Sequence, residues 1–252
     1  MKLNNKTHDA AILAPLSVHP NYQKQGIGTR LIEEGHKRLK TRNIQCSLLL
    51  GHPSYYPRFG YNTHMFSESK IKIKQEDISS VVSDSIKERK PETGDIKALQ
   101  KLWEITFKDT DMTIQPGNNL TDWVSCGKGM TTSVLELDNE VVGYIRYLTN
   151  QPQSIQSLLS DGSPNRFSSI VSFMNQKITP DRKDLILPLD PNSNFVEQLI
   201  TIPYEKEENV WPAAMLKILN IDNIDFIGYI ESVLNGERNP GMITWPIEFD
   251  VC

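Results

Sequence analysis

The order of hydrophobic and polar positions divides the first 60 residues into short elements. An apolar run at residues 10–18 predicts a buried strand, which ends at His19-Pro20, where a helix cannot continue. Apolar positions then recur every four residues over 27–39, as on an amphipathic helix, and a second apolar run at 46–50 predicts the next buried strand. Strand, glycine-containing loop, helix and strand together predict an α/β (α+β) fold with a mixed central sheet flanked by helices.

The pattern changes after Tyr61. Residues 70–74 alternate lysine with isoleucine, which predicts a half-exposed edge strand that stays exposed. The polar stretch 75–85 reads as a linker, so we expect two units, at residues 1–75 and 86–252.

The second unit contains its own alternation of strands and helices. The residues between 137 and 141 read as a hairpin turn. The predicted strands are 86–89, 132–137, 141–148, 154–159 and 185–189. One predicted helix begins at residue 95, and the others cover 166–178, 213–219 and 224–234.

Composition narrows the class of protein. The 252 residues carry a net charge of −4, but residues 1–75 hold 12 Lys/Arg and 4 Asp/Glu while the remainder holds 15 and 27. The basic first unit suits a polyanionic small molecule, and because its densest basic stretch, 36–40, lacks interleaved aromatics, we expect no nucleic acid partner.

Membrane and metal partners are not expected either. No apolar run approaches the roughly 18 residues of a membrane span, and the first ten residues lack the apolar core of a signal peptide. The three cysteines are scattered and form neither a disulfide framework nor a zinc spacing, so we expect no metal and a cytoplasmic location.

The stretch from Gln23 to Gly28 carries the most chemical information. It lies between a predicted strand and a predicted helix, where unpaired N–H groups and the helix dipole favour an anion, and Gly26 and Gly28 let the backbone approach a pyrophosphate. A dinucleotide fingerprint needs a third glycine where Leu31 stands, and a Walker loop needs a Lys-Ser/Thr where Thr29-Arg30 stands. On spacing alone, a plain strand–turn–helix connection stays open.

The wider context adds a family resemblance. Residues 16–31 resemble motif A of the GNAT superfamily of N-acetyltransferases, in which a strand ending V-x-P precedes Q/R-x-x-G-x-G/A and a helix. Residues 48–61 resemble the next strand of that family and its Y-x-x-x-G-F/Y signature. The resemblance covers residues 10–66.

The resemblance implies an acetyl-CoA site. Backbone N–H groups of 25–29 would bind the pyrophosphate, and the backbone of 16–18 would hold the pantetheine arm. Tyr56 would protonate the departing thiolate, with the neighbouring Tyr55 as the alternative donor. The implied cofactor-binding residues are Leu16, Ser17, Val18, Gln23, Lys24, Gln25, Gly26, Ile27, Gly28, Thr29 and Arg30.

Two departures from the family pattern leave an alternative open. A whole GNAT domain has three strands and two helices ahead of motif A, and residues 10–18 contain no acidic side chain to act as a base; His8, Asp9, His19 and His52 are the nearest titratable groups. Residues 86–148 look like the opening of a second GNAT domain, but 161–166 do not match Q-x-x-G-x-G.

We therefore expect a tandem GNAT protein with a truncated first domain and a degenerate second one. The expected activity is transfer of acetyl from acetyl-CoA to a small-molecule amine, such as a polyamine or an antibiotic-like acceptor. The alternative is an inactive CoA-binding or regulatory module. The apolar edge of residues 10–18 also predicts a cover, either strands 132–137 and 141–148 or a second copy of the chain in a homodimer.

Overall fold

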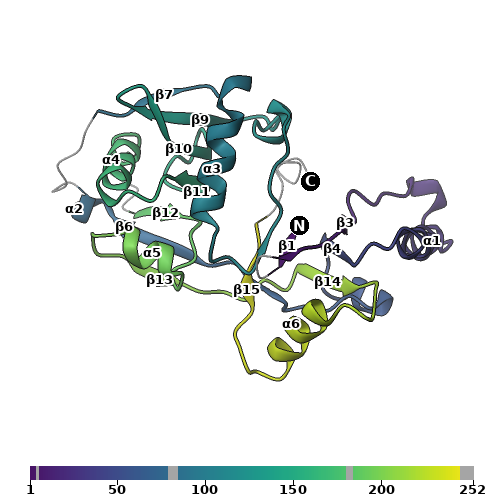
Figure 1. The fold of residues 1–252 in the computed structure, drawn as a ribbon. Helices are drawn as coiled ribbons and strands as arrows, with labels where there is room; N and C mark the ends of the chain where they lie inside the picture. Colours follow the sequence, from purple (N-terminus) through teal and green to yellow (C-terminus); the bar gives the residue numbers. More distant parts are fainter. Residues whose placement is uncertain (4–5, 79–84, 180–183, 245–252) are drawn as a thin grey trace.

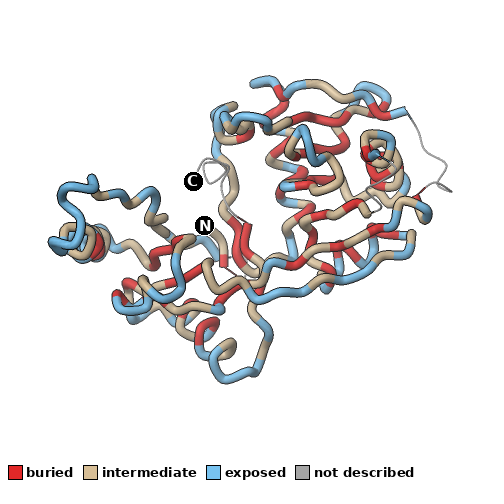
Figure 2. Tube along the Cα trace, turned by 180° about the vertical axis from the view of Figure 1, so that it is seen from behind, coloured by how far each residue is buried: buried red, intermediate tan, exposed pale blue. Residues whose placement is uncertain are grey.

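The computed structural model describes residues 1–3, 6–78, 85–179 and 184–244. They form two lobes, the α1 lobe and the α3 lobe, with helices α1 and α3 lying far apart (Figure 1). Buried residues follow the strands of both lobes, whereas the loop ahead of α1 is exposed (Figure 2). Among the described residues no helix combines the length and apolar character needed to cross a membrane.

The α1 lobe is built on a three-stranded sheet in the order β14-β4-β3. β4 is parallel to β3 and antiparallel to β14. α1 packs on one face of β4 through Ile32 and Leu49, while Leu48 faces a second core that includes Phe226 of α6. The elements are β3 (Ala10–Ile12), α1 (Ile27–Thr41), β4 (Cys46–Leu50), β14 (Ala214–Ile218) and α6 (Ile224–Leu234).

The α3 lobe contains a four-stranded antiparallel sheet in the order β11-β10-β9-β7. The predicted hairpin is confirmed, because Asp138 and Asn139 have φ of 52° and 64°, which suits a tight turn between β9 and β10. The elements are β7 (Lys87–Arg89), α3 (Ile96–Thr106), β9 (Met130–Leu137), β10 (Glu140–Leu148), β11 (Ile155–Ser160) and α4 (Pro164–Asn175).

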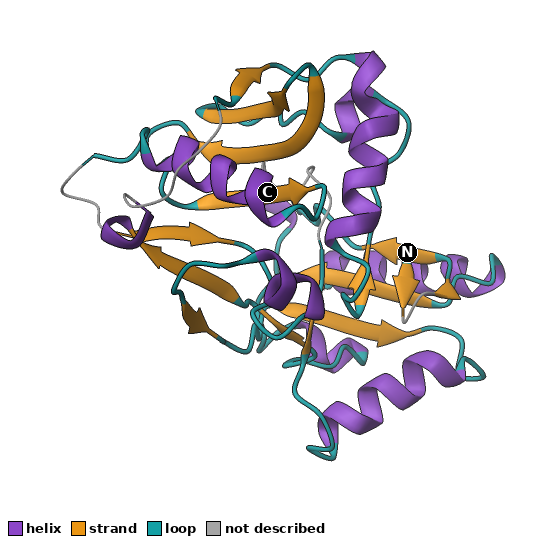
Figure 3. Cartoon of the chain, turned by 60° about the vertical axis from the view of Figure 1, so that its left-hand side comes forward, coloured by secondary structure: helices purple, strands orange, loops and turns teal. Residues whose placement is uncertain are grey.

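A further sheet, in the order β12-β6-β13, adjoins this lobe (Figure 3). A bridge between Ser154 and Ile186 joins it to the β11 edge. The elements are β6 (Lys70–Lys74), α2 (Gln75–Ile78), β12 (Asp184–Leu187), α5 (Asn194–Leu199) and β13 (Glu205–Glu207). The remaining short elements are β1 (Lys2–Leu3), β2 (Lys6–Thr7), β5 (Phe66–Ser67), β8 (Met112–Thr113), β15 (Gly241–Met242), η1 (Pro20–Tyr22), η2 (Tyr56–Phe59), η3 (Thr93–Asp95) and η4 (Leu120–Asp122).

The prediction that residues 70–74 form an exposed edge is wrong. β6 is the central strand of its sheet, and Ile71 and Ile73 are fully buried. The lysines between them are matched across the strands, because Lys72 and Lys74 pair with glutamates of β13. The alternation therefore marks one buried face and one face of cross-strand ion pairs. Of the expected linker, residues 75–78 form α2, while 79–84 lie outside the described residues.

The predicted helix at 213–219 is also wrong, since the segment is strand β14. Five register pairs join it to β4, from Ala214 opposite Leu50 to Ile218 opposite Cys46. β14 therefore covers the β4 edge away from β3. The prediction that strands 132–137 and 141–148 cover the edge of residues 10–18 is wrong, because these strands pair with each other in the other lobe. Together with the β13–β6 and β15–β5 pairs, this pairing crosses the predicted division between 1–75 and 86–252.

The first strand is shorter than predicted. β3 ends at Ile12, and the hydrogen bond from the Leu13 N–H to the Leu48 carbonyl (2.8 Å) follows it. Within the described part of the chain, residues 14–18 make no backbone hydrogen bond to β4, and β3 has no strand on its other side. Homodimer formation along this edge stays a prediction.

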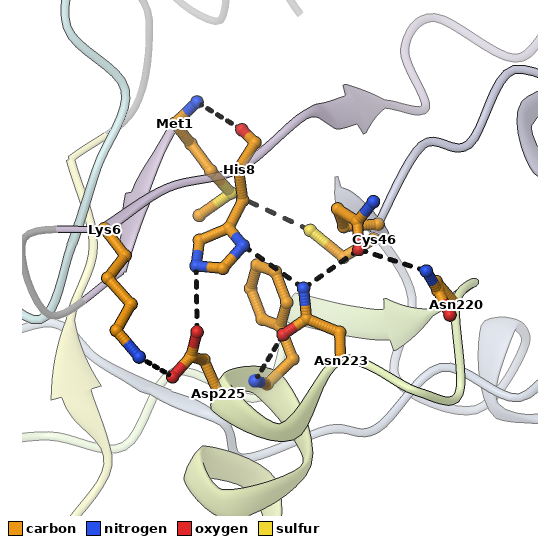
Figure 4. A network of polar contacts seen from close by, with 9 residues as sticks. Met1, Lys6, His8, Cys46, Asn220, Asn223 and Asp225 are labelled. Atoms are coloured by element: carbon orange, nitrogen blue, oxygen red, sulfur yellow. Dashed lines mark hydrogen bonds and ion pairs between the residues drawn. The ribbon is translucent and has the colours of Figure 1, made fainter.

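A polar network ties the C-terminal third to the start of β4 (Figure 4). The Asn223 amide donates to the Gln45 side chain at 2.9 Å and faces His8 Nδ1 at 3.2 Å. Asp225, at the start of α6, pairs with Lys6 at 2.6 Å and lies 3.6 Å from His8 Nε2. Because these contacts surround the N-terminal end of α6 and the chain entering β4, they fix the C-terminal segment onto the α1 lobe.

Truncation of the β14 core is expected to destabilise the whole protein. Leu216 is fully buried between β4 and α6, so Leu216→Ala should lower the free energy of unfolding by about 2–5 kcal/mol in denaturant titrations. The matched control is Leu234→Ala, because Leu234 is 62% exposed and its loss should change stability by no more than about 0.5 kcal/mol. Equal effects of the two variants would contradict the pairing of β14 with β4.

Candidate active site

The first turn of α1 is open to an anion. Its N-cap is Gly26, which has φ of 75° and offers no side-chain cap to the following N–H groups, and the first turn contains no acidic residue. A Cβ built on Gly26 would have no atom within 4 Å, so the space in front of the turn is clear. The predicted residues Ile27, Gly28 and Thr29 thus present unpaired backbone donors at the positive end of a 15-residue helix.

The preceding loop is held by its own side chains. The Gln23 amide donates to the Val18 carbonyl at 3.0 Å, and the Gln25 amide donates to the Asn21 carbonyl at 3.3 Å. His19 Nδ1 accepts from the Asn21 N–H at 3.3 Å, so this histidine acts as a cap. The loop reaches Gly26 through Lys24, whose φ of 60° is left-handed. Both predicted glutamines therefore shape the loop through their side chains.

Two further residues stand beside the first turn of α1. A Cβ placed on Gly28 would lie 3.5 Å from the Tyr55 hydroxyl and 3.8 Å from Val18 Cγ2, so these groups line the turn. The Arg58 guanidinium donates to Thr29 Oγ1 at 3.3 Å and lies 4.0 Å above the Tyr55 ring. Arg58 was not among the predicted site residues, because only the 3₁₀ turn η2 folds it back onto α1.

Tyr56 lies next to Tyr55, with the two ring centroids 5.0 Å apart. Its ring lies against Gly51, the residue that follows β4, so closely that a side chain at position 51 would collide with it. Burial, and next the neighbouring Tyr55 hydroxyl, raise the pKa of Tyr56 above its ordinary value. The phenol is therefore protonated at neutral pH and can donate a proton.

The other predicted residues lie around the first turn of α1. Lys24 and Arg30 are exposed cations next to the first turn. Leu16, Ser17 and Val18 lie after β3, where the described residues make no backbone hydrogen bond to β4. The titratable groups weighed as bases are scattered: His8 lies near the start of β4 and His52 is exposed just after its end.

The corresponding position in the α3 lobe is closed. Ser163 caps α4 by accepting from the Arg166 N–H, and the Asp161 carboxylate accepts from the Ser163 N–H at 3.0 Å. Asp161 also pairs with the Arg166 guanidinium at 2.8 Å. A carboxylate of the chain itself thus occupies the place in which an external anion would bind, and this helix start differs from that of α1 in charge as well as sequence.

A buried polar group supports the tyrosine segment from behind. Tyr61 bonds to Ser47 at 2.7 Å and to His36 Nε2 at 3.1 Å, while the Lys217 ammonium lies 3.3 Å from His36 Nδ1 and also donates to the Phe59 carbonyl. Burial, with the Lys217 charge second, lowers the pKa of His36 from 6.5 to about 4. His36 is therefore neutral, and β14 helps to position η2.

Comparison with known proteins agrees with this geometry. Residues 1–64 match the family model described as an acetyltransferase (GNAT) domain. The chain is 50% identical over 50 residues to the uncharacterized N-acetyltransferase YjhQ of Escherichia coli K12, a match over 20% of this chain and 28% of that protein. Residues 1–64 are therefore similar to a GNAT acetyltransferase domain.

Solved structures extend the similarity of fold beyond residue 64. A GCN5-related N-acetyltransferase from Kribbella flavida has a TM-score of 0.60 at 15% identity, over 83% of this chain and 52% of that one. A probable N-acyltransferase from Enterococcus faecalis V583 has a TM-score of 0.59 at 13% identity, over 87% and 56%. These matches show a GNAT-like α/β fold, and the chain spans about half the length of both structures.

Acid should weaken the support behind the tyrosine segment. Since the folded pKa of His36 is about 4 and the ordinary value is 6.5, the unfolded chain takes up a proton first as the pH falls. Stability is fully present above pH 6.5 and should fall by roughly 2 kcal/mol from this group between pH 7 and 5. Urea titrations at both pH values should show that His36→Gln loses this part of the pH dependence and that His64→Gln, at an exposed position, retains it. The same pH dependence in all three proteins would exclude the neutral, buried His36.

Proposed function

We propose that the protein is an acetyl-CoA-dependent N-acetyltransferase whose donor binds at the start of α1. The observation that carries the proposal is the uncapped first turn of α1 within a segment that matches the GNAT family, next to the Arg58 guanidinium. The pyrophosphate would accept from the N–H groups of Gly26 to Thr29, and Arg58, Lys24 and Arg30 would add positive charge.

The stretch after β3 suits the pantetheine arm. The last backbone hydrogen bond from this segment to β4 is made by the Leu13 N–H, and the described residues 14–18 make none. The backbone of Leu16, Ser17 and Val18 is therefore available for an extended ligand. The Val18 carbonyl already accepts from Gln23, so we assign the arm to the remaining groups of this segment.

The chemistry requires positioning and one proton donor. Acetyl-CoA supplies its acetyl group as a thioester. A neutral amine forms the C–N bond to the carbonyl carbon, the C–S bond breaks with release of the thiolate, and the proton that the nitrogen loses goes to solvent. Tyr56, at the C-terminal end of β4, would give its proton to that thiolate. We propose a small-molecule amine as acceptor and, since Cys46 and Cys126 are free thiols, a reducing cytoplasmic setting. A CoA-binding module without catalysis is not favoured by the comparisons.

Blocking the first turn of α1 should abolish CoA binding. Gly26→Val would place a branched side chain where the donors of the turn face solvent, so calorimetry should show CoA affinity reduced about ten-fold or more. Gly236→Val is the matched control, because Gly236 also has a left-handed φ (70° against 75°) and no atom within 4 Å. An unchanged CoA affinity in Gly26→Val, with the fold intact, would contradict the donor site.

Removal of one hydroxyl should separate catalysis from binding. Tyr56→Phe should reduce thiol release with a panel of amines by about 10²–10⁴-fold while CoA affinity stays constant. Tyr55→Phe is the control, since its hydroxyl faces Gly28, and it should leave the rate of the chemical step unchanged. Wild-type turnover in Tyr56→Phe would show that its ring is structural.

A further inference from the structure

A cavity of about 300 Å³ lies between the two lobes. Its walls come from α3, β10 and β11 on one side and from residues 67–70, Trp211 and 242–244 on the other. The sequence motifs of the donor site do not include any of these segments. The cavity is therefore a second site, distinct from the first turn of α1.

The walls are aromatic and already fixed in place. Trp123 makes edge contacts with Trp103 (ring centroids 6.1 Å apart, planes at 88°) and with Tyr144 (6.0 Å, 83°). The Trp123 indole donates to the Gly117 carbonyl at 3.0 Å, and the Tyr144 hydroxyl donates to the Trp123 carbonyl at 2.5 Å. Because these rings need no rearrangement, a flat ligand meets a preformed surface.

One wall residue has an unused donor. Trp103 is 7% exposed, and its indole N–H has no hydrogen-bond partner within the described residues. Buried N–H groups are normally paired, and this one is enclosed by protein atoms, so it is an unsatisfied group of the wall that a ligand in the cavity does not reach.

One carboxylate on the cavity wall has no ion-pair partner among the described residues and can accept a cation. Asp122 lines the cavity, and its Oδ2 accepts from the Asn119 N–H at 3.0 Å, but no cation lies within ion-pair distance of it among the described residues. The other carboxylate, Glu68, is neutralised by Lys70 at 2.8 Å. Arg146 also lines the cavity. The experiment must therefore distinguish a cationic ligand from an anionic one.

The cavity meets the donor site at the end of β4. Leu49 faces α1, whereas Leu48 and Leu50 face the opposite side of the sheet, and Leu50 lines the cavity. The next residue, Gly51, is covered by the Tyr56 ring. Ligands on α1 and in the cavity would therefore approach this strand end from opposite faces of one sheet.

We propose that this cavity binds the acceptor of the transfer and that the acceptor is an arylalkylamine. Its ring would lie against the cavity side of Trp103, Trp123 and Tyr144. Its ammonium group would pair with Asp122 and would lose one proton to solvent before the amine attacks the thioester. This inference rests on the proposed acetyltransferase function, but the binding site itself does not require the donor to be present.

The test uses three matched probes on the full chain without CoA: 2-phenylethylamine, 2-phenylethanol and 3-phenylpropionate. Three of the four tryptophans line the cavity, so tryptophan fluorescence excited at a wavelength that these probes do not absorb reports its occupancy. The amine should give a saturable change at a concentration about ten-fold below that of the alcohol, since an ion pair with Asp122 adds to ring burial. The acid should bind more weakly than both.

A variant that removes the charge of Asp122 tests where the ammonium group of the amine binds. Asp122→Asn keeps an acceptor for the Asn119 N–H and should weaken amine binding about ten-fold while leaving the alcohol unchanged. Asp138→Asn is the matched control, at an exposed turn of the same lobe, and should change neither.

Each contrary result has a separate meaning. Equal binding of amine and alcohol, tighter binding of the acid, or the absence of a saturable change would overturn the arylalkylamine proposal. If CoA still binds and its affinity depends on Gly26, the proposed function is retained and the arylalkylamine proposal is rejected. If the amine binds but CoA does not, the cavity proposal is retained and the donor site is rejected.

Discussion

The pairing of β14 with β4 is the constraint on which the α1 lobe depends. β4 has four fully or nearly fully buried residues, and its backbone groups on the side away from β3 are satisfied by a strand more than 160 residues later in the chain. The same strand supplies Lys217, which bonds to the Phe59 carbonyl and faces His36, and so holds the tyrosine segment against the sheet. The C-terminal third is thus part of the scaffold of the candidate donor site.

The first turns of helices α1 and α4 differ in their charge and in their capping. α1 begins with a left-handed glycine, no cap and a nearby guanidinium, whereas α4 begins with a serine cap and the carboxylate of Asp161. The helix dipole makes both ends attractive to anions, but only α1 leaves the place open. With the aromatic cavity on the opposite face of β4, the proposed donor site is polar, the proposed acceptor site is apolar, and the two meet at one strand end.

Local periodicity predicted the elements whose structure is decided locally. The repeat from Ile27 gave α1, the apolar run gave β4, and 224–234 gave α6 with the observed bounds. The errors arose where a distant strand decides the outcome. Residues 213–219 form a strand because β4 offers a free edge. Residues 70–74 form a central strand because glutamates more than 130 residues away pair with its lysines. Arg58 was not predicted as a site residue because it contacts Thr29 only after the turn η2 brings the two residues together.

The most direct test of the account is a crystal structure of the full chain with CoA bound. We predict the pyrophosphate oxygens within hydrogen-bond distance of the backbone N–H groups of Ile27, Gly28 and Thr29, with the Arg58 guanidinium turned toward the phosphates and the thiol at the end of β4 beside Tyr56. CoA bound at the start of α4, or in the aromatic cavity with the first turn of α1 empty, would contradict the account.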